Sequence, residues 1–386
     1  MNERILLYTS GRLAKTRVTG GVKRFCELLR EFPKYCELTL MSGDDTNPAN
    51  KNVKFVSMKH GETDYRNEVS RGIHNISYIR RLRDYYQHVI VFDVPPALLL
   101  AVMNVPHMCL MVRKDLIGYK KQELKERGNN RAIDTATLWC LNLAESIVLK
   151  HCERVIVQCE YDKEQILARH SNIASAISRK IFCQINNINP SWVSIEEKGI
   201  DRTLSDSHFS IGCITSFSSK RKGCDIFLEA VKILIDEGYT IRAYIAGDGK
   251  LLDYFKNMYA DYSDIIFLGR INSACEVYSM CDLAVVPSRE DSCPNTLLEA
   301  LINRTPVIGA NRGGIPELLQ DNEALFLPDT DSLAEKIKKL MDNKNELRGM
   351  SERQIARREI LTFDWGRRIF DLVTGKNNVR DNETVE

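Results

Sequence analysis

Two acidic residues are the side chains best suited to chemistry in this 386-residue chain. Asp291 and Glu299 are separated by seven residues and follow an apolar run that ends at Pro287. A helix that begins near Asn295 places Glu299 about one turn inside it, while Asp291 stays in the preceding loop. Because carboxylates accept hydrogen bonds from sugar or ribose hydroxyls, both can reach into one cleft. A capping carboxylate followed by a solvated glutamate is the simpler alternative.

A basic run forms a second candidate site. Residues 218–223 read Ser-Ser-Lys-Arg-Lys-Gly and join the first expected strand of the second half to its first helix. The three cations, Lys220, Arg221 and Lys222, can hold a diphosphate and stabilise a leaving phosphate. An exposed basic loop is the alternative.

Two glycine pairs complete the set. Gly20 and Gly21 precede a helix, where backbone amides favour anions and glycine lets a ligand come close. The turn 311–317, Asn-Arg-Gly-Gly-Ile-Pro-Glu, follows a strand and is predicted to form the wall beside Asp291. A plain turn explains either pair equally well.

The apolar pattern predicts the elements that position these residues. Short apolar strands alternate with helices, which is typical of parallel βαβ construction. The polar stretch 187–208 interrupts this alternation and is the best candidate for a linker. The sequence therefore predicts two Rossmann-like halves, with ligands at the carboxyl ends of the strands, between the halves. Strands are expected at 4–9, 37–41, 53–56, 88–92, 107–112, 154–158 and 180–185, then at 209–215, 240–246, 265–268, 283–286 and 306–309. Helices are expected at 21–29, 66–87, 97–103, 132–150 and 160–170, then at 223–237, 250–259, 274–280, 295–303, 331–342, 346–359 and 365–373.

The charge is unevenly distributed. The whole chain has a net charge of +2, but residues 1–190 hold 29 basic and 20 acidic residues, while the rest hold 25 and 32. The first half is therefore at +9 and the second at −7. Such asymmetry predicts an anionic acceptor or membrane surface as partner of the first half. The basic stretch 66–88, with apolar residues every three positions, is either an ordinary domain helix or a lipid-facing surface. No nucleic-acid-binding signature is found.

The cysteines and the amino terminus indicate a location. Twelve cysteines without a CxxC pair fit a reducing cytoplasm, and the apolar stretch near the start is too short for a signal peptide. Residues 94–112 carry no charge, but their prolines predict a helix start, a turn and a buried strand rather than a membrane span.

Taken together, these segments resemble the donor domain of the retaining GT-B glycosyltransferases of family 4, the group 1 glycosyl transferases. The resemblance covers residues 210–345 well, through KRKGCDIFLEA, YIAGDGKLL, IIFLGRI and the run from Pro287 to Leu319. It is weaker in the first half. The family implies an α/β fold of two Rossmann-like domains facing a central cleft. The acceptor domain would span 1–188 and the donor domain 189–360, with the C-terminal helix in 361–386 crossing back to the first.

The resemblance assigns roles residue by residue. Glu299 matches the residue that holds the nucleotide ribose, and Asp291 matches the one that contacts the transferred sugar. Lys222 matches the lysine of the basic pair on the diphosphate. Three further segments match donor-contacting positions: Pro294, Asn295 and Thr296 at the sugar and diphosphate, Arg270 and Ile271 at the base, and Gly20 and Gly21 at the phosphate.

The chain also departs from the family pattern. The family's arginine, five residues before the lysine, falls on Phe217, so Arg221 or Lys220 is the candidate for the missing cation. The family often has a histidine on the acceptor side, where this chain reads Arg113-Lys114-Asp115; any of these three can take that place.

The resemblance implies transfer of a UDP- or GDP-linked sugar with retention, to a glycan or lipid-linked acceptor in bacterial surface polysaccharide synthesis. It implies no cofactor and no metal, because cations and helix dipoles act on the diphosphate. The enzyme is expected in the cytoplasm or peripherally on the inner face of the membrane. The alternatives are a non-catalytic nucleotide-sugar-binding partner protein and a sugar-nucleotide epimerase or phosphorylase of the same fold. A nicotinamide-dependent dehydrogenase is disfavoured because no GxGxxG follows the first strand.

Overall fold

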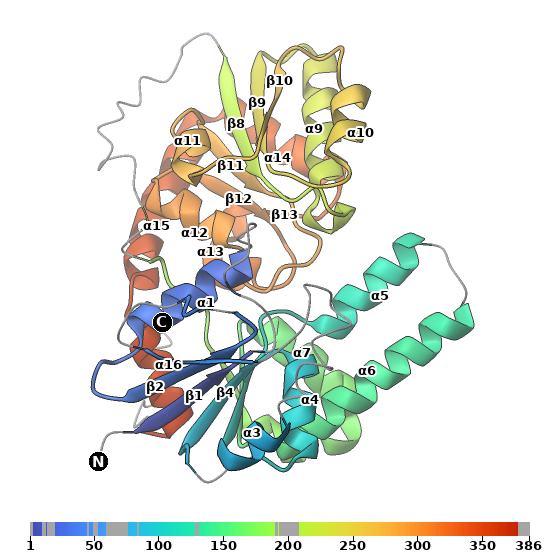
Figure 1. The fold of residues 1–386 in the computed structure, drawn as a ribbon. Coiled ribbons are helices and arrows are strands. Elements are labelled where there is room, and N and C mark those ends of the chain that lie inside the picture. Colours follow the sequence, from blue (N-terminus) through green and yellow to red (C-terminus); the bar gives the residue numbers. More distant parts are fainter. Residues whose placement is uncertain are drawn as a thin grey trace. The chain divides into compact units, whose positions relative to one another are not determined.

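The computed structural model describes residues 3–9, 13, 20–44, 46–48, 53–58, 76–82, 85–127, 131–189, 192 and 208–376. The chain divides into two compact units, each built around one parallel sheet (Figure 1). Unit 1 comprises Met1–Gln184 and Asp364–Glu386, and unit 2 comprises Ile185–Phe363. The arrangement of two α/β units, predicted from the alternation of strands and helices, is confirmed.

Unit 1 contains a seven-stranded parallel sheet in the order β3-β2-β1-β4-β5-β6-β7. Strand order reverses between β1 and β4, so this is the topological switch point of the sheet. The strands are β1 (Arg4–Tyr8), β2 (Glu37–Ser42), β3 (Lys54–Ser57), β4 (His88–Phe92), β5 (Met108–Met111), β6 (Arg154–Val157) and β7 (Ile181–Cys183).

Helices cover both faces of this sheet (Figure 1). Leu6 and Val91 face the core that α4 and α6 share, while Phe92 stacks on Phe25 of α1, with ring centroids 4.4 Å apart. This alternation follows from the period-two geometry of a strand. The helices are α1 (Gly20–Glu31), α3 (Ile76–Leu82), α4 (Val94–Val102), α5 (Leu116–Arg127), α6 (Arg131–His151), α7 (Glu160–Arg169), α8 (Ala174–Ile177) and α16 (Trp365–Thr374).

Helix α16 closes unit 1 from the other end of the chain, as expected. It packs against α1 so tightly that a Cβ on Gly366 would lie 2.3 Å from the carbonyl oxygen of Glu31. Phe370 also meets Phe32 edge to face. The glycine is therefore needed at this contact.

Unit 2 contains a six-stranded parallel sheet in the order β10-β9-β8-β11-β12-β13, whose switch point lies between β8 and β11 (Figure 1). The strands are β8 (Phe209–Ile214), β9 (Ile241–Ala246), β10 (Ile265–Gly269), β11 (Leu283–Val286), β12 (Val307–Ala310) and β13 (Leu325–Phe326). The helices are α9 (Cys224–Asp236), α10 (Leu252–Met258), α11 (Ala274–Tyr278), α12 (Asn295–Ile302), α13 (Ile315–Leu319), α14 (Thr330–Asp342) and α15 (Lys344–Leu361). Helix α9 packs on α14, and α12 packs on α11 and α15.

The boundary between the units differs slightly from the expected residues 188 and 360. Ile188 donates its amide hydrogen to Leu361, at 2.9 Å, and the Asn187 side chain donates to the carbonyl oxygen of Phe363, at 2.8 Å. These bonds join the segment after β7 to the end of α15, so the division falls after Gln184 and after Phe363. Most of the expected linker, 193–207, lies outside the described residues.

Several elements were not predicted. Helix α5 was missed because its sequence, LIGYKKQELKER, lacks a continuous apolar stripe. The short α13 and β13 were missed because elements of five and two residues show no period. Of the expected helix at 66–87, the structure describes only α3 and residues 85–87. Residues 94–112 form α4 and β5, so the prediction of a broken segment is confirmed.

Candidate functional site

The predicted catalytic residues Lys222, Asp291 and Glu299 lie on the segments that follow the two strands at the switch point of the unit 2 sheet. The segment after β8 carries Lys222 in a short 3-10 turn, and the segment after β11 carries Asp291. Loops at such a point diverge to opposite faces of a parallel sheet and leave a crevice for a ligand. The predicted site residues therefore come from the two loops that the topology favours.

Lys222 and Asp291 form an ion pair. The Lys222 ammonium contacts the Oδ2 atom of Asp291, and their side chains are 25% and 14% exposed, respectively. Burial lowers the pKa of Lys222 from its ordinary value, and the charge of Asp291 opposes that shift. A half-buried ammonium of this kind can meet an anion brought into the same site.

Glycine backbones hold the two loops together. Gly223 has φ +71°, and a Cβ there would lie 1.9 Å from the carbonyl oxygen of Pro287. In the turn after β12, Gly313 has φ +60°, and a Cβ there would lie 2.2 Å from the carbonyl oxygen of Asp291; Gly314 donates its amide hydrogen to the same carbonyl at 2.9 Å. The predicted wall formed by the turn 311–317 is thereby confirmed. Only glycine satisfies both the positive φ and the close approach.

Arg221 and Arg289 fix the same loops through side chains. Arg221 donates to the carbonyl oxygen of Glu290 at 2.6 Å. Arg289 donates to both carboxylate oxygens of Asp225, at 2.6 and 3.0 Å, and to the carbonyl of Lys220. The pair of Arg289 and Asp225 was missed at the level of sequence, although both residues lie next to predicted site residues. Arg221, predicted to supply a cation, here braces the Asp291 loop.

The residues of α12 lie as the sequence predicts. Pro294 is the N-cap, Asn295 and Thr296 open the helix, and Glu299 follows one turn later. The Tyr278 hydroxyl donates to the Thr296 carbonyl at 3.0 Å. Burial, followed by the nearby charge of Glu299, raises the pKa of Tyr278 well above its ordinary value. Glu299 is thus positioned near a neutral phenol, and its carboxylate can accept a hydrogen bond from a ligand hydroxyl.

Phe217, at the position of the family arginine, is fully buried. Its ring lies 6.1 Å from that of Phe255 and 6.3 Å from that of Phe267. Gly249 and Gly247 approach it closely, and Phe217 exchanges backbone hydrogen bonds with Asp248 and Leu251. The side chain is therefore a core residue and offers no polar contact to a ligand.

Arg270 and Ile271 follow β10, next in the sheet to the loop after β9. Gly247 donates its amide hydrogen to the carbonyl of Gly269 at 2.7 Å, which ties these two loops together. Arg270 is exposed and Ile271 half-buried. The two residues lie at the carboxyl edge of the sheet, two strands from the switch point.

A second cation–carboxylate pair lies beside the switch point of unit 1, on the loops after β4 and β5. Arg113, after β5, pairs with Asp93, after β4, through its Nε atom at 3.1 Å and its Nη2 atom. The backbone amide of Arg113 also donates to Asp93, at 3.2 Å. A Cβ on Gly21 of α1 would lie 2.9 Å from the Arg113 guanidinium. The structure thus brings together Gly21 and Arg113, which the sequence had assigned separately to phosphate and acceptor.

Asp93 was missed by sequence reasoning. It has φ +65°, a strained value for an aspartate, between β4 and the proline-led start of α4. Such strain costs about 1–3 kcal/mol and persists where the surroundings enforce it. The signal available in the sequence was an acidic residue between an apolar strand and Val94-Pro95-Pro96.

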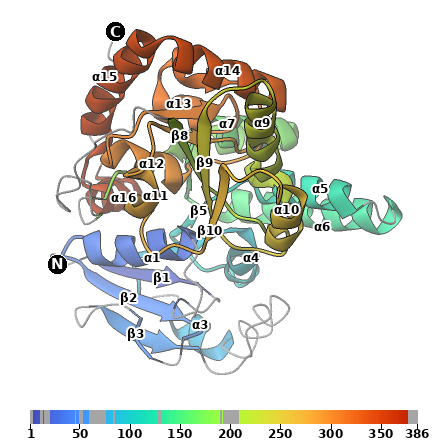
Figure 2. The same cartoon turned by 90° about the horizontal axis from the view of Figure 1, so that it is seen from above.

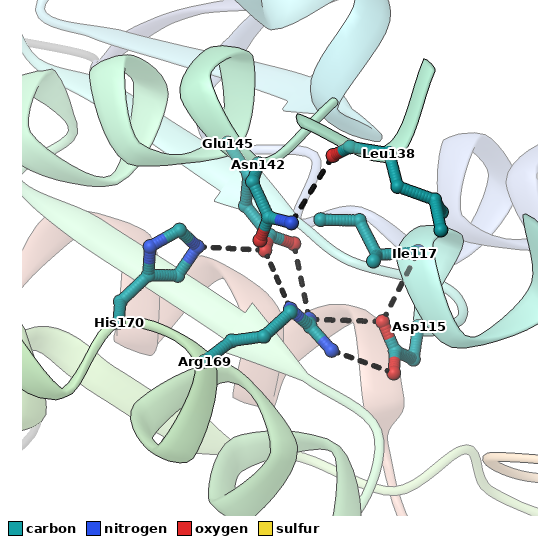
Figure 3. A network of polar contacts seen from close by, with 7 residues as sticks. All are labelled: Asp115, Ile117, Leu138, Asn142, Glu145, Arg169 and His170. Carbon is teal, nitrogen blue, oxygen red and sulfur yellow. Dashed lines mark hydrogen bonds and ion pairs between the residues drawn. The ribbon is translucent and has the colours of Figure 1, made fainter. Parts of the chain in front are cut away.

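Asp115, the other acceptor-side candidate, belongs to a buried network (Figure 3). Its side chain is 4% exposed, pairs with Arg169 at 2.9 Å and accepts the amide hydrogen of Ile117 at the start of α5. Arg169 also contacts Glu145 at 3.0 Å, and His170 contacts Glu145 at 2.8 Å. Asp115 therefore links the start of α5 to the end of α7, and its carboxylate is engaged in these contacts instead of facing a ligand.

Among the described residues, no group of three or more His, Cys, Asp or Glu side chains is arranged to hold a metal ion. Lys222 with Asp291 and Arg113 with Asp93 each join one cation to one carboxylate.

Comparison with known proteins identifies the second unit. Residues 208–343 match the family described as Glycosyl transferases group 1. The chain is 28% identical over 157 residues to N-acetyl-alpha-D-glucosaminyl L-malate synthase of Bacillus anthracis, a match that covers 39% of this chain and 40% of that protein. The matched segments span 29–40% of the first three curated relatives.

Solved structures resemble the whole chain. Sucrose-phosphate synthase of Thermosynechococcus elongatus matches with a TM-score of 0.74 at 14% identity, over 97% of this chain and 99% of that one. Anabaena HepE, in complex with UDP and glucose, matches with a TM-score of 0.69 at 13% identity, over 97% and 100%. At such identity the likeness establishes the fold, which is GT-B.

Proposed function

We propose that the chain, of which residues 208–343 match the group 1 glycosyltransferase family, transfers a sugar from a nucleotide-sugar donor to a hydroxyl of a glycan or lipid-linked acceptor, with retention at the anomeric carbon. The observation that carries the proposal is the ion pair of Lys222 and Asp291 at the switch point of unit 2. It presents one cation for a diphosphate and one carboxylate for a neighbouring sugar.

The donor would be held by the loops already described. Its diphosphate contacts Lys222 and the first amides of α12, which carry a partial positive charge. Asp291 turns from Lys222 to the hydroxyls of the sugar, and Glu299 accepts from those of the ribose. The pairing of Lys222 with Asp291 in the free protein keeps both charges neutralised until the donor arrives.

The chemistry follows from these contacts. The bond between the anomeric carbon and the diphosphate oxygen breaks, and the acceptor oxygen attacks from the same face. The departing phosphate accepts the acceptor's proton. Lys222 stabilises the charge that develops on the leaving oxygen, a preorganised electrostatic role. In this proposal Lys222 and the α12 amides act in place of a divalent metal.

Unit 1 would take the acceptor. Arg113, held by Asp93 beside Gly21, offers a guanidinium that suits a phosphate or another anionic group of the acceptor. A lipid-linked sugar in bacterial surface polysaccharide synthesis has this chemistry. We place the enzyme in the cytoplasm; all twelve cysteines are free of disulfides, which is compatible with a reducing compartment.

The burial of Phe217 favours one alternative, a nucleotide-sugar-binding protein without transferase activity, because a cation of the family pattern is missing. Binding and turnover separate the two. We expect UDP- or GDP-linked sugars to raise the melting temperature of the protein in a panel that also contains ADP-linked sugars. A stabilising donor should also be consumed, with release of nucleoside diphosphate when acceptor is present.

Two variants test the site itself. Glu299→Ala should weaken donor binding, and Lys222→Ala should abolish turnover, while both proteins keep the wild-type circular dichroism spectrum. Wild-type turnover in both would remove the site assignment. A protein that binds the donor but never releases nucleoside diphosphate would support the non-catalytic alternative.

A further inference from the structure

Helix α6 carries an apolar face that unit 1 leaves open. Trp139 is 64% exposed, Ile133 63%, Leu143 48% and Ile147 38%. Trp139, Leu143 and Ile147 follow one another at intervals of four residues, and Ile133 lies six residues before Trp139, so all four fall on one side of the helix. We define the α6 face by the exposed apolar residues of this side: Ala132, Ile133, Ala136, Trp139, Cys140, Leu143 and Ile147.

This face is unusually apolar for a helix of its length. Residues 132–151 are long and apolar enough to span a membrane, yet only 17% of this apolar stretch is buried. An amphipathic core helix would turn its apolar residues inward. Here the exposed residues from Thr135 to Ala144 include no charge. Contiguous exposed apolar surface of this kind marks a site of interaction.

The opposite side of α6 is fixed in the domain (Figure 3). Val148 and Leu149 are fully buried in the core of unit 1. Glu145, one turn earlier, is buried and contacts Arg169 and His170. Separating such a buried charge from its partners costs about 3–5 kcal/mol. A helix that crossed a bilayer would lose these contacts, so the open face of α6 is better suited to lie against a surface.

The charges around the face favour an anionic surface. Lys150, at the end of α6, and Lys121, on the neighbouring α5, are both exposed. Helices α5 and α6 lie side by side in both views (Figures 1 and 2), and the half-buried Lys114 adds a cation just before α5, whereas Lys120 is paired with Glu123. In a symmetric dimer the same patch would meet itself, bringing these lysines together. A bilayer of anionic lipid complements both the apolar centre and the basic border.

We propose that the α6 face docks unit 1 onto an anionic lipid bilayer, with Trp139 and Leu143 inserted at the level of the headgroups. The surface differs from the basic stretch 66–88 that the sequence suggested. Helix α5 begins three residues after Arg113, so docking brings the lipid surface to the acceptor side of unit 1. The proposal extends the function proposed above, but lipid binding is measured without donor or turnover.

The distribution of tryptophans provides a direct probe. The chain has three tryptophans, of which Trp192 and Trp365 are buried and Trp139 is exposed. A change in the fluorescence of solvent-exposed tryptophan therefore reports on Trp139. We expect the emission of the full chain to shift to shorter wavelength on addition of vesicles of phosphatidylcholine mixed with phosphatidylglycerol. Acrylamide quenching should fall in parallel. Vesicles of phosphatidylcholine alone should give a weaker change, and high salt should reduce it.

A matched pair of variants tests the location. Trp139→Glu combined with Leu143→Glu should reduce co-sedimentation with the anionic vesicles ten-fold or more. Ile360→Glu, on α15 of unit 2, is the control, because Ile360 is 60% exposed and lies outside the α6 face. It should co-sediment like the wild type. Both proteins should retain the wild-type melting temperature, since the altered side chains are exposed.

Three outcomes would overturn the proposal. Unchanged Trp139 emission with vesicles shows that the face does not meet lipid. Equal loss of binding in Ile360→Glu shows that the added charge, and not the α6 face, is responsible. A concentration-dependent dimer that light scattering detects in the wild type but not in the α6 variant assigns the face to a second copy of the chain. None of these results bears on donor binding, so failure here is separable from failure of the glycosyltransferase proposal.

Discussion

Both sheets place one cation and one carboxylate at the carboxyl ends of their strands, but the two pairs are held differently. In unit 2, the loop that carries Lys222 touches the loop of Asp291 at Gly223, and the turn after β12 touches the same loop at Gly313. In unit 1, Arg113 is held by the side chain of Asp93 and only its guanidinium approaches Gly21. Close backbone contacts fix the loops of the first pair, whereas the contacts around the second pair involve side-chain atoms that can move.

This difference suggests a division of labour. A nucleotide-sugar has a constant diphosphate, which a rigid cradle of loops can match. Acceptors vary, and a guanidinium that pivots on one carboxylate can adapt to them. In the proposed function, the unit 2 pair meets the constant diphosphate and the unit 1 pair meets the variable acceptor. Variants of either pair test this difference.

The largest effect is expected from Lys222→Ala. Removing one preorganised donor of charge stabilisation lowers kcat by about 10²–10³-fold in comparable sites. Lys222→Arg should recover part of the rate, because it restores the charge with a different geometry. Steady-state assays with donor and acceptor measure both. If Lys222→Ala reduced the rate no more than Arg113→Ala does, unit 2 would not hold the catalytic pair.

A large structural effect is expected from Gly223→Ala. A Cβ would lie 1.9 Å from the carbonyl of Pro287 at a positive φ, so the loop must move or the protein loses stability, by about 2–4 kcal/mol. Gly21→Ala is the counterpart in unit 1. Its Cβ meets only the tip of Arg113, which can move away, so the melting temperature should change little. Chemical denaturation measures the free energy of unfolding of both variants. Equal losses of stability in the two would contradict the comparison.

A moderate, substrate-specific effect is expected from Arg113→Ala. Loss of a charge-assisted contact to an anionic acceptor should raise the acceptor KM by about ten-fold, while the KM of the donor stays constant. Asp93→Asn retains the side chain but removes its charge, and should give a smaller change of the same kind. A rise in donor KM alone would place Arg113 with the donor instead.

The smallest effect concerns how unit 1 holds its last helix. Burial, followed by the charge of Glu27, raises the pKa of Glu31 from 4.5 to about 7, beside the contact of α1 with α16. The folded state therefore binds this proton more tightly than the unfolded state does. Its stabilising contribution is complete below pH 4.5 and is lost as the pH rises through 7.

Glu31→Gln should remove this dependence. We expect the variant to be about 1 kcal/mol more stable than the wild type at pH 8, a value reduced for the partial exposure of the side chain. The two proteins should be nearly equal at pH 4. Glu335→Gln, at an exposed position on α14, is the control and should leave the difference between the two pH values unchanged. Melting curves at both pH values measure the effect.

Much of the unit 2 site followed from the sequence. Lys222, Asp291 and Glu299 lie in short segments that directly follow strong apolar strands, and the order of parallel strands brings such segments to one edge. Gly223 directly follows Lys222, and Gly313 lies in the turn that packs on Asp291. Asp93 was not predicted, because a single acidic residue after a strand shows no pattern until its neighbour Arg113, 20 residues later, is placed beside it.

Helix α5 and the α6 face illustrate the remaining limit. The apolar period of residues 132–150 predicted a helix, and the usual inference is that its apolar residues are buried. In fact Glu145 faces inward to Arg169 and His170, while Trp139 faces outward. Which side of a nearly uncharged helix meets the core depends on partners more than 20 residues away, which periodicity does not contain.

The sequence alone determined two α/β halves, a basic first half, and the loops that carry Lys222, Asp291 and Glu299. These are local properties: apolar strands, turn-forming glycines and charge are present in short segments. The tertiary structure decided that Phe217 is core, that Asp115 serves a buried network, that Asp93 holds Arg113, and that α6 is open. Each of these depends on contacts between distant segments, which form only when the sheets and helices are packed.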